Sequence, residues 1–374
     1  PGLLVILAVL VPGGAMLAKM EHSGSTLLMV PRSSDTPQTL QRLAQAFPAG
    51  MDSPYSLLLE PKSGGSVYQE GFFDESRRLL AHVEELAGEG AQVMSPMWIT
   101  GSVGNNLSFT VLSPFLFARH DAVCEVLLLQ GLVEACRALR YMANTTVNGD
   151  RSAVAAQVII SHPLGSPGAS DFTRRVREAM HDFAANATFA RVQLAGAGPI
   201  YADSVDVVYG LMPIVLGITL VVVLGIVGLL YRSAGIALRA LLTIAFTIAF
   251  SFGVGMGIYQ YGWLEGLGVS RFQRDGALSW LVPPVCFSVI LGLALDYDIF
   301  LVGRIVEFKL MGFTDRAAVE LGLWKTGKVI TAAGLIMAIS FAGLILSETA
   351  MLNQSCVMLV SAVLVDTFVV RSLV

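Results

Sequence analysis

Six long apolar runs alternate with polar connections along the chain, and one long mixed segment, residues 21–204, separates the first run from the other five. A helix needs about 20 apolar residues to cross the roughly 30 Å hydrocarbon core of a bilayer. The runs therefore predict a membrane α-helical bundle of six transmembrane helices, in residues 1–20 and 205–374. They are Gly2–Leu17, Val207–Tyr231, Gly235–Tyr259, Leu278–Val302, Val329–Leu346 and Met351–Val370.

The first apolar run has two interpretations, since a signal peptide also contains an apolar stretch. No basic residues precede Gly2, which favours a spanning helix. The chain opens at Pro1 inside this run and stops at Val374 inside another. We therefore expect a fragment of a longer protein.

The mixed segment, residues 21–204, has the patterns of an α+β domain inserted between the first two spans. Helical and strand periodicities alternate, so a βαβ arrangement occurs about twice and predicts two small helix-on-sheet sandwiches. The expected helices are Thr36–Phe47, Phe73–Leu86 and Ser170–Phe183, and the expected strands are Ser56–Leu59, Ala153–Ser161 and Phe189–Leu194.

Positive charge in the short connections predicts the orientation, because loops rich in Lys and Arg stay in the cytoplasm. Arg232 and Arg239 flank one connection, and five further basic residues crowd another: Arg304, Lys309, Arg316, Lys325 and Lys328. The domain at residues 21–204 is then extracytoplasmic, and we expect a multi-pass protein of the plasma membrane.

Three N-glycosylation acceptor patterns, at Asn106, Asn144 and Asn186, fall in the segment expected outside. They would fit a eukaryotic source and a glycoprotein, although so short a pattern also arises by chance.

Composition supports a membrane protein and excludes several other classes. The chain is 54% hydrophobic and 14% charged, with a mean hydropathy of +0.67 and a net charge of −4, so no basic surface for nucleic acid is expected. The four cysteines form no CxxC or zinc spacing, and the five histidines form no H-E-x-x-H. The glycines at 253, 255 and 257 lie inside an apolar span, without the context of a phosphate loop. We expect no enzyme, no metal and no other cofactor.

The residues with the strongest chemical signal are Asp296, Tyr297 and Asp298, inside an otherwise apolar span. A charged Asp at a helix centre costs about 2.5 to 3.5 kcal/mol on insertion scales, so Asp296 is expected to face protein or water. Burial disfavours the charged form of a carboxyl group, which suits a proton relay. A purely structural, hydrogen-bonded Asp296 is the alternative. Asp298 lies about 200° around the helix from Asp296, and a structural role is as plausible there.

A second intramembrane acid, Asp366, lies in the last apolar run and is expected to face the bundle interior with Asp296. Arg371 follows it and is either its partner or a marker of the cytoplasmic side.

The order of these motifs resembles that of MMPL (mycobacterial membrane protein large) transporters of the resistance-nodulation-division (RND) superfamily. The resemblance covers the whole chain, strongly after about Ala195, and corresponds to the second half: helices seven to twelve with the second extracytoplasmic domain. Four motifs carry it: Gly-Pro199-Ile-Tyr201, Asp296-Tyr297 through Arg304, Thr326-Gly-Lys328-Val-Ile-Thr331, and Asp366 through Arg371.

The resemblance implies export of lipids or other amphiphiles, driven by protons, with a porter-like outer domain. It implies a proton relay of Asp296, Tyr297 and Asp366, supported by Arg371, Lys328, Thr331 and Arg304. An Asp-Tyr pair on the family's fourth helix should meet Asp296 and Tyr297, but the first six helices are absent. The implied partners are protons, membrane lipids, a lipid or other hydrophobic substrate, and either the missing N-terminal half or a second copy.

Two alternatives stay open at this point. A Patched-like sterol or lipid transporter shares the Gly-xxx-Asp pattern but usually lacks the Tyr that follows here. A non-transporting receptor or scaffold would only present the outer domain.

Overall fold

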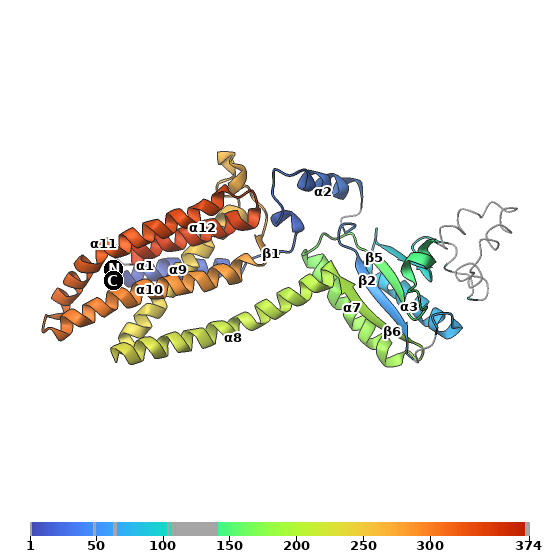
Figure 1. Ribbon diagram of the computed structural model, residues 1–374, viewed down its shortest axis with the longest axis horizontal. Helices are drawn as coiled ribbons and strands as arrows, with labels where there is room; N and C mark the ends of the chain where they lie inside the picture. Colours follow the sequence, from blue (N-terminus) through green and yellow to red (C-terminus); the bar gives the residue numbers. More distant parts are fainter. Residues whose placement is uncertain are drawn as a thin grey trace. The chain divides into compact units, whose positions relative to one another are not determined.

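The chain forms two units, each with its own hydrophobic core (Figure 1). Unit 1 comprises residues 1–37 and 205–374, and unit 2 comprises residues 38–204. The computed structural model describes residues 2–47, 50–62, 66–102, 105, 109 and 141–370.

Unit 1 is built from long apolar helices, as the apolar runs predict. Five helices in the described part of the chain are long and apolar enough to cross a membrane. They are α8 (Ala197–Tyr231), α9 (Ala234–Tyr259), α10 (Val282–Leu310), α11 (Asp315–Ala342) with its 3-10 extension η6 (Gly343–Leu346), and α12 (Ala350–Leu364) with its π-helical extension η7 (Val365–Val370). The helical membrane bundle is thus confirmed. The sixth predicted span is not, because α1 (Gly2–Leu17) has only 16 residues.

The start of α10 differs from the predicted run, which began at Leu278. The helix begins at Val282, where Pro283 and Pro284 occupy its first positions. Proline suits the first turn of a helix, since the N–H groups there have no intrahelical acceptor. Leu278 and Ser279 instead form strand β7, which pairs in parallel with β1 (His22–Ser23).

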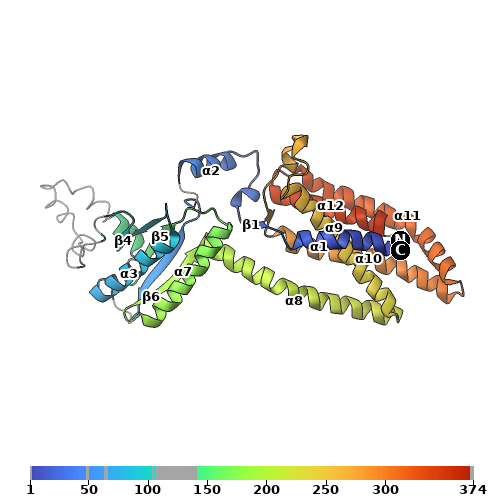
Figure 2. The same cartoon turned by 180° about the vertical axis from the view of Figure 1, so that it is seen from behind.

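Helices α9 and α12 are the most enclosed of the five candidate spans. Helix α1 packs on α9, while α10 and α11 pack on α12 and on each other, as both ribbon views show (Figure 2). Small residues permit close approach: a Cβ on Gly13 would lie 2.9 Å from the Ala249 Cβ atom. Helix α8 contacts α10 through Tyr231, whose hydroxyl donates to the Ile299 carbonyl at 2.9 Å.

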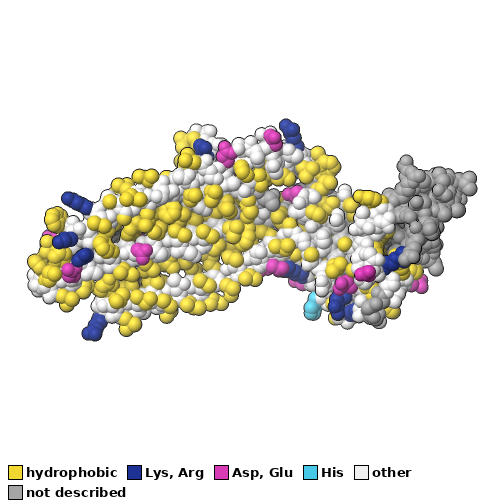
Figure 3. Space-filling view, in the orientation of Figure 1, with side chains coloured by type: hydrophobic (Ala, Val, Ile, Leu, Met, Phe, Trp, Pro, Cys, Tyr) yellow, Lys and Arg dark blue, Asp and Glu magenta, His cyan; other side chains and the backbone are white. Residues whose placement is uncertain are grey.

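The outer surface of these helices is apolar. Leu229 on α8 is 82% exposed and Val221 is 69% exposed, values that would be costly in water. Figure 3 shows an almost continuous hydrophobic surface over the helices in view, with most charged side chains near their ends. Such a surface suits contact with lipid or with further membrane helices.

Unit 2 alternates strands and helices. The predicted elements are confirmed with shifted ends, and two short strands are added. The elements are α2 (Asp35–Ala46), which starts just before the unit, β2 (Tyr55–Pro61), α3 (Glu70–Ala87), β3 (Gln92–Ser95), β4 (Trp98–Ile99), β5 (Val154–Ile159), α7 (Pro167–Asn186) and β6 (Ala190–Gly196).

The prediction of two separate sandwiches is wrong for the described residues, which form one five-stranded sheet of order β4-β3-β5-β2-β6. Every pairing in it is antiparallel. The strands of each βαβ unit lie parallel with a gap between them, and a strand of the other unit fills each gap. This interleaving is the split-βαβ topology of ferredoxin-like domains. The periodicity of the sequence predicts each βαβ unit, but it does not predict which strands of the two units pair with each other.

The core of unit 2 lies between the sheet and helices α3 and α7, which pack against each other. Strand β2 alternates buried and half-buried positions, so that Leu57 and Leu59 are fully buried. Phe72, Phe73 and Phe172 from the helices complete this core. The sequons at Asn144 and Asn186 are exposed, and Asn106 lies outside the described residues. Glycosylation stays a prediction.

Candidate functional site

A pocket lined by two carboxylates lies within unit 1, between α10, α11 and the π-helical segment η7. Its empty space, including the part open to the outside, is about 300 Å³. Asp298, Asp366 and Tyr297 supply its polar groups, and the remaining lining is apolar: Ala294, Leu301, Ile330 and Val370. Ionisable side chains inside apolar spans are rare and mark functional sites, proton relays among them.

Asp298 is held by an arginine from a neighbouring helix. Arg239, on α9, donates from Nη2 to the Asp298 Oδ1 atom and forms an ion pair with it. The side chain of Asp298 is 11% exposed and that of Arg239 is 29% exposed. The Arg239 Nε atom is buried and has no hydrogen-bond partner within the described residues. The pair therefore neutralises Asp298 but leaves one guanidinium donor unused.

Asp366 is bound much more loosely. Among the described residues it accepts one hydrogen bond, from the Thr247 hydroxyl of α9, which lies 3.5 Å from Oδ1, the outer limit of a hydrogen bond. No basic side chain pairs with Asp366 in the part of the chain that the structure describes. Asp366 thus has no fixed counter-charge there.

The backbone around Asp366 is unusual because Val365–Val370 is a π-helix that continues α12. Its neighbour Thr367 is fully buried against Gly334 of α11, where an added Cβ would lie only 2.3 Å from the Thr367 hydroxyl. That hydroxyl has no hydrogen-bond partner among the described residues. Short π-helical turns occur frequently at functional sites.

Tyr297 and Asp366, both expected from the sequence, line this pocket together. The Tyr297 hydroxyl donates to the Met337 Sδ atom of α11 at 3.1 Å. Tyr297 therefore bridges α10 and α11 beside the two acids.

Asp296 does not join them, contrary to the expectation that it shares the bundle interior with Asp366. It lies on the exposed face of α10. The physical reason is helical geometry: Asp296 and Asp298 are about 200° apart around the helix, so only one of them can face the pocket. In this chain Asp298 does so.

The residues expected to support the relay lie elsewhere. Arg304 pairs with Glu307 at 2.5 Å on an exposed face of α10, and Lys328 is exposed on α11. The Thr331 hydroxyl donates to the Gly327 carbonyl at 2.8 Å within its own helix. Arg371 lies outside the described residues.

Sequence reasoning missed the role of Arg239 and left that of Asp298 open. Arg239 served only as a marker of orientation, although its place six residues into α9 puts it within an apolar helix. An Arg and an Asp inside neighbouring spans usually pair with each other. The presence of Arg239 and Asp298 in two apolar runs could therefore have predicted their pairing.

Five candidate spans and buried acids within them define a multi-pass membrane protein. The sequence profile of the MMPL family matches residues 29–374. The chain belongs to the MMPL family.

Several bacterial proteins are similar to this chain. It is 32% identical over 212 residues to the membrane protein SCO6666 of Streptomyces coelicolor, a match covering 55% of this chain and 28% of the relative. It is 31% identical over 182 residues to the mycolic acid-containing lipids exporter MmpL11 of Mycolicibacterium smegmatis, covering 49% and 19%. The trehalose monomycolate exporter MmpL3 of Mycobacterium tuberculosis is 29% identical over 182 residues, covering 48% and 19%. The matched part is thus less than a third of each relative's length.

Proposed function

We propose that this chain is one half of a proton-driven transporter that exports lipids or other amphiphiles across the plasma membrane. The observation that carries this proposal is the pocket where Asp298 and Asp366, from two apolar helices, lie together. The names of two similar proteins support the substrate class: one is an exporter of mycolic acid-containing lipids and the other a trehalose monomycolate exporter.

Within the pocket, Asp366 is the group that takes up and releases the proton. Asp298 already has the positive charge of Arg239 beside it, whereas among the described residues Asp366 has only the 3.5 Å contact from Thr247. A buried charge without a partner is costly, so Asp366 has more to gain from binding a proton. Tyr297 adds a hydroxyl that can pass a proton along the pocket.

Asp296 acts on the other face of α10, where helices of a second half would cover it. A carboxylate facing lipid is costly, so an exposed intramembrane Asp indicates a protein partner or a water-filled path. That partner is an N-terminal half of the same transporter or a second copy of this chain. The short coverage of the longer relatives favours the first.

Unit 2 is the porter-like domain outside the membrane. Basic residues mark the cytoplasmic side: Arg232 follows α8, and Arg316 lies in the first turn of α11, directly after the short connection from α10. The residues of unit 2 enter and leave the membrane region on the opposite side. A split-βαβ domain on that side would receive the amphiphile that the membrane region releases.

The test uses the complete transporter in lipid vesicles with an imposed pH gradient and a phospholipid carrying a nitrobenzoxadiazole headgroup as the probe. The variant Asp366→Asn should lose gradient-driven movement of the probe and proton uptake together. Asp315→Asn is the matched control, because this acid pairs with Lys309 at 2.9 Å and is 81% exposed. Gradient-driven transport at the wild-type rate in Asp366→Asn would reject the proposal.

A further inference from the structure

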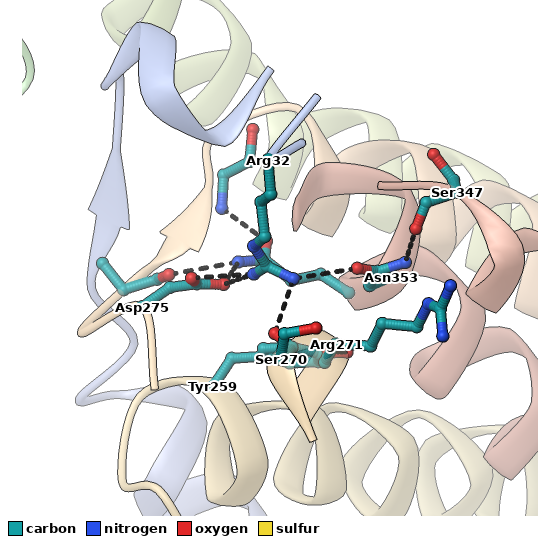
Figure 4. Close-up of polar contacts among 10 residues, drawn as sticks. Arg32, Tyr259, Ser270, Arg271, Asp275, Ser347 and Asn353 are labelled. Carbon is teal, nitrogen blue, oxygen red and sulfur yellow. Dashed lines mark hydrogen bonds and ion pairs between the residues drawn. The ribbon is translucent and has the colours of Figure 1, made fainter. Parts of the chain in front are cut away.

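A second polar cluster lies in unit 1, at the end of the bundle where α12 begins (Figure 4). At its centre is Arg32, in the segment that leads from the first helix toward unit 2. The guanidinium donates to the Asp275 Oδ1 atom at 3.1 Å, to the Ser270 carbonyl at 2.8 Å and to the Asn353 Oδ1 atom at 3.1 Å. One side chain therefore joins the connection between α9 and α10 to the first turn of α12.

The backbone strengthens the same junction. The Arg32 N–H donates to the Glu348 carbonyl at 3.0 Å, and the Ser33 hydroxyl donates to the Glu348 carboxylate. Residues 32 and 33 are thus tied to the turn just before α12, as well as to the helix itself.

The acceptors of Arg32 are held rigidly in turn. Asn353 and Gln354 are fully buried, although both are polar. The Gln354 amide donates to Asp275 Oδ2 at 3.0 Å and accepts from the Ser279 N–H at 2.8 Å, while the Asn353 amide donates to the Ser347 carbonyl at 2.8 Å. We call Arg32, Asp275, Asn353 and Gln354 the Arg32 clamp.

Stability alone is a weak reason for such a cluster. Replacing a buried ion pair by apolar residues often leaves stability unchanged or raises it, while paired charges can fix one arrangement of the chain against others. The Asp275 side chain is 11% exposed and that of Arg32 is 24% exposed. The clamp therefore specifies where the start of α12 lies relative to residues 29–34.

The far end of the same helix carries the candidate proton site. From Asn353 to Asp366 the chain is helical without a break, over roughly 20 Å at about 1.5 Å per residue. The π-helical turn around Asp366 lies next to the close contact of Thr367 with Gly334. A change in charge at Asp366 would act on a turn whose geometry differs from that of the rest of the helix, and α12 would carry any shift or rotation to the clamp.

We propose that the Arg32 clamp couples the proton state of Asp366 to the segment that leads into unit 2, with α12 as the transmitting element. This inference rests on the proposed function, since it needs Asp366 to exchange protons. Arg32 is a positioning residue in this scheme. It fixes residues 29–34 to α12, and the chain continues from there through α2 into unit 2.

The decisive variant is Arg32→Gln in the complete transporter, assayed in vesicles for proton uptake and for movement of the labelled phospholipid. Loss of coupling should lower phospholipid movement about ten-fold, within the usual 5- to 150-fold range of coupling between sites, while proton uptake stays near the wild-type rate. Arg32→Lys, which keeps the charge but not the forked geometry, should recover part of the movement. Arg316→Gln is the matched control, since it removes an exposed arginine paired with Glu320.

Equal loss of proton uptake and phospholipid movement in folded Arg32→Gln would overturn the coupling role, and so would no loss of either. Asp366→Asn separates this inference from the proposed function: normal proton uptake in that variant rejects the function, whatever Arg32→Gln does.

A second measurement does not depend on any Arg32 variant. Asp366→Asn, which imitates the protonated acid, should change hydrogen exchange at the Arg32 amide and in residues 348–354 relative to the wild type. Unchanged exchange in both segments would also overturn the coupling.

Discussion

The two units bury carboxylates in opposite ways. In unit 2, Glu75 is 8% exposed, and its carboxylate accepts three backbone N–H groups, from Thr188 and Phe189 at 2.9 Å and from Ala190 at 3.0 Å. In unit 1, Asp366 accepts one hydrogen bond within the part of the chain that the structure describes, from Thr247 at 3.5 Å. Fixed backbone donors hold the Glu75 carboxylate in place as part of the fold, whereas the described residues hold Asp366 by a single weak contact. The comparison separates a structural acid from the one proposed to exchange a proton.

The largest expected effect concerns this contrast directly. Asp366→Asn should reduce gradient-driven transport to the level seen without a gradient, while Glu75→Gln should leave transport per folded molecule unchanged. The assay is phospholipid movement in vesicles, normalised to the amount of folded protein. Loss of transport in both variants would remove the distinction between the two acids.

Breaking the Arg239–Asp298 pair should have the next largest effect. Arg239→Gln leaves Asp298 in the pocket without its counter-charge, and removing one partner of a buried pair costs about 3 to 5 kcal/mol. Because Arg239 is 29% exposed, solvent screening should reduce this to roughly 1 to 3 kcal/mol. The measurement is thermal unfolding in detergent.

The double variant Arg239→Gln/Asp298→Asn serves as its control and should regain most of the lost stability, since neither charge remains. A double variant as unstable as Arg239→Gln would show that Arg239 acts through packing and not through Asp298.

Glu75→Gln should have a local effect in unit 2. A neutral amide offers one acceptor oxygen, so at least one of the three N–H groups loses its partner, and hydrogen bonds to a charged group contribute about 1.5 to 3 kcal/mol each. Hydrogen exchange at Thr188, Phe189 and Ala190 should accelerate roughly ten- to 150-fold, at about 1.4 kcal/mol per factor of ten. Exchange in α9 should stay at the wild-type rate. Acceleration there as well would contradict the independence of the two cores.

The sequence predicts the spans well because the membrane imposes a length and a composition on each helix. It predicts the start of α10 poorly, since Leu278 is as apolar as the helix that follows and only Pro283 shows where the helix can begin. In unit 2 it predicts each βαβ unit, but the interleaving of β2 with β5 depends on contacts between distant segments.

The residues of the candidate site also fall into those that the sequence predicts and those that it does not. Tyr297 and Asp366 could be predicted because an ionisable group in an apolar run is conspicuous. The side of α10 that faces the pocket could not, since that helix is apolar all round and Asp296 and Asp298 are equally conspicuous. Arg32 and Asp275 are 243 residues apart and lie in polar connections, where a charge is ordinary. Their pairing depends on the three-dimensional fold.

The smallest expected effect is a change in the pKa of Asp275, a carboxyl group of the Arg32 clamp that lies outside the spans. It extends the comparison of buried carboxylates to a third acid. Burial raises the pKa of Asp275, while the hydrogen bond from Gln354 and the charge of Arg32 lower it. Arg32→Gln removes the positive charge and leaves burial less opposed, so the pKa of Asp275 should rise above its wild-type value. The protonated carboxyl band would then persist to higher pH in infrared difference spectra, with Asp275→Asn identifying the band. An unchanged or lower pKa would mean that Arg32 and Asp275 do not pair in the working protein. In that case Asp275, like Glu75, would depend on its own local setting. The clamp would then lack the ion pair between Arg32 and Asp275 that is proposed to help hold residues 29–34 to α12.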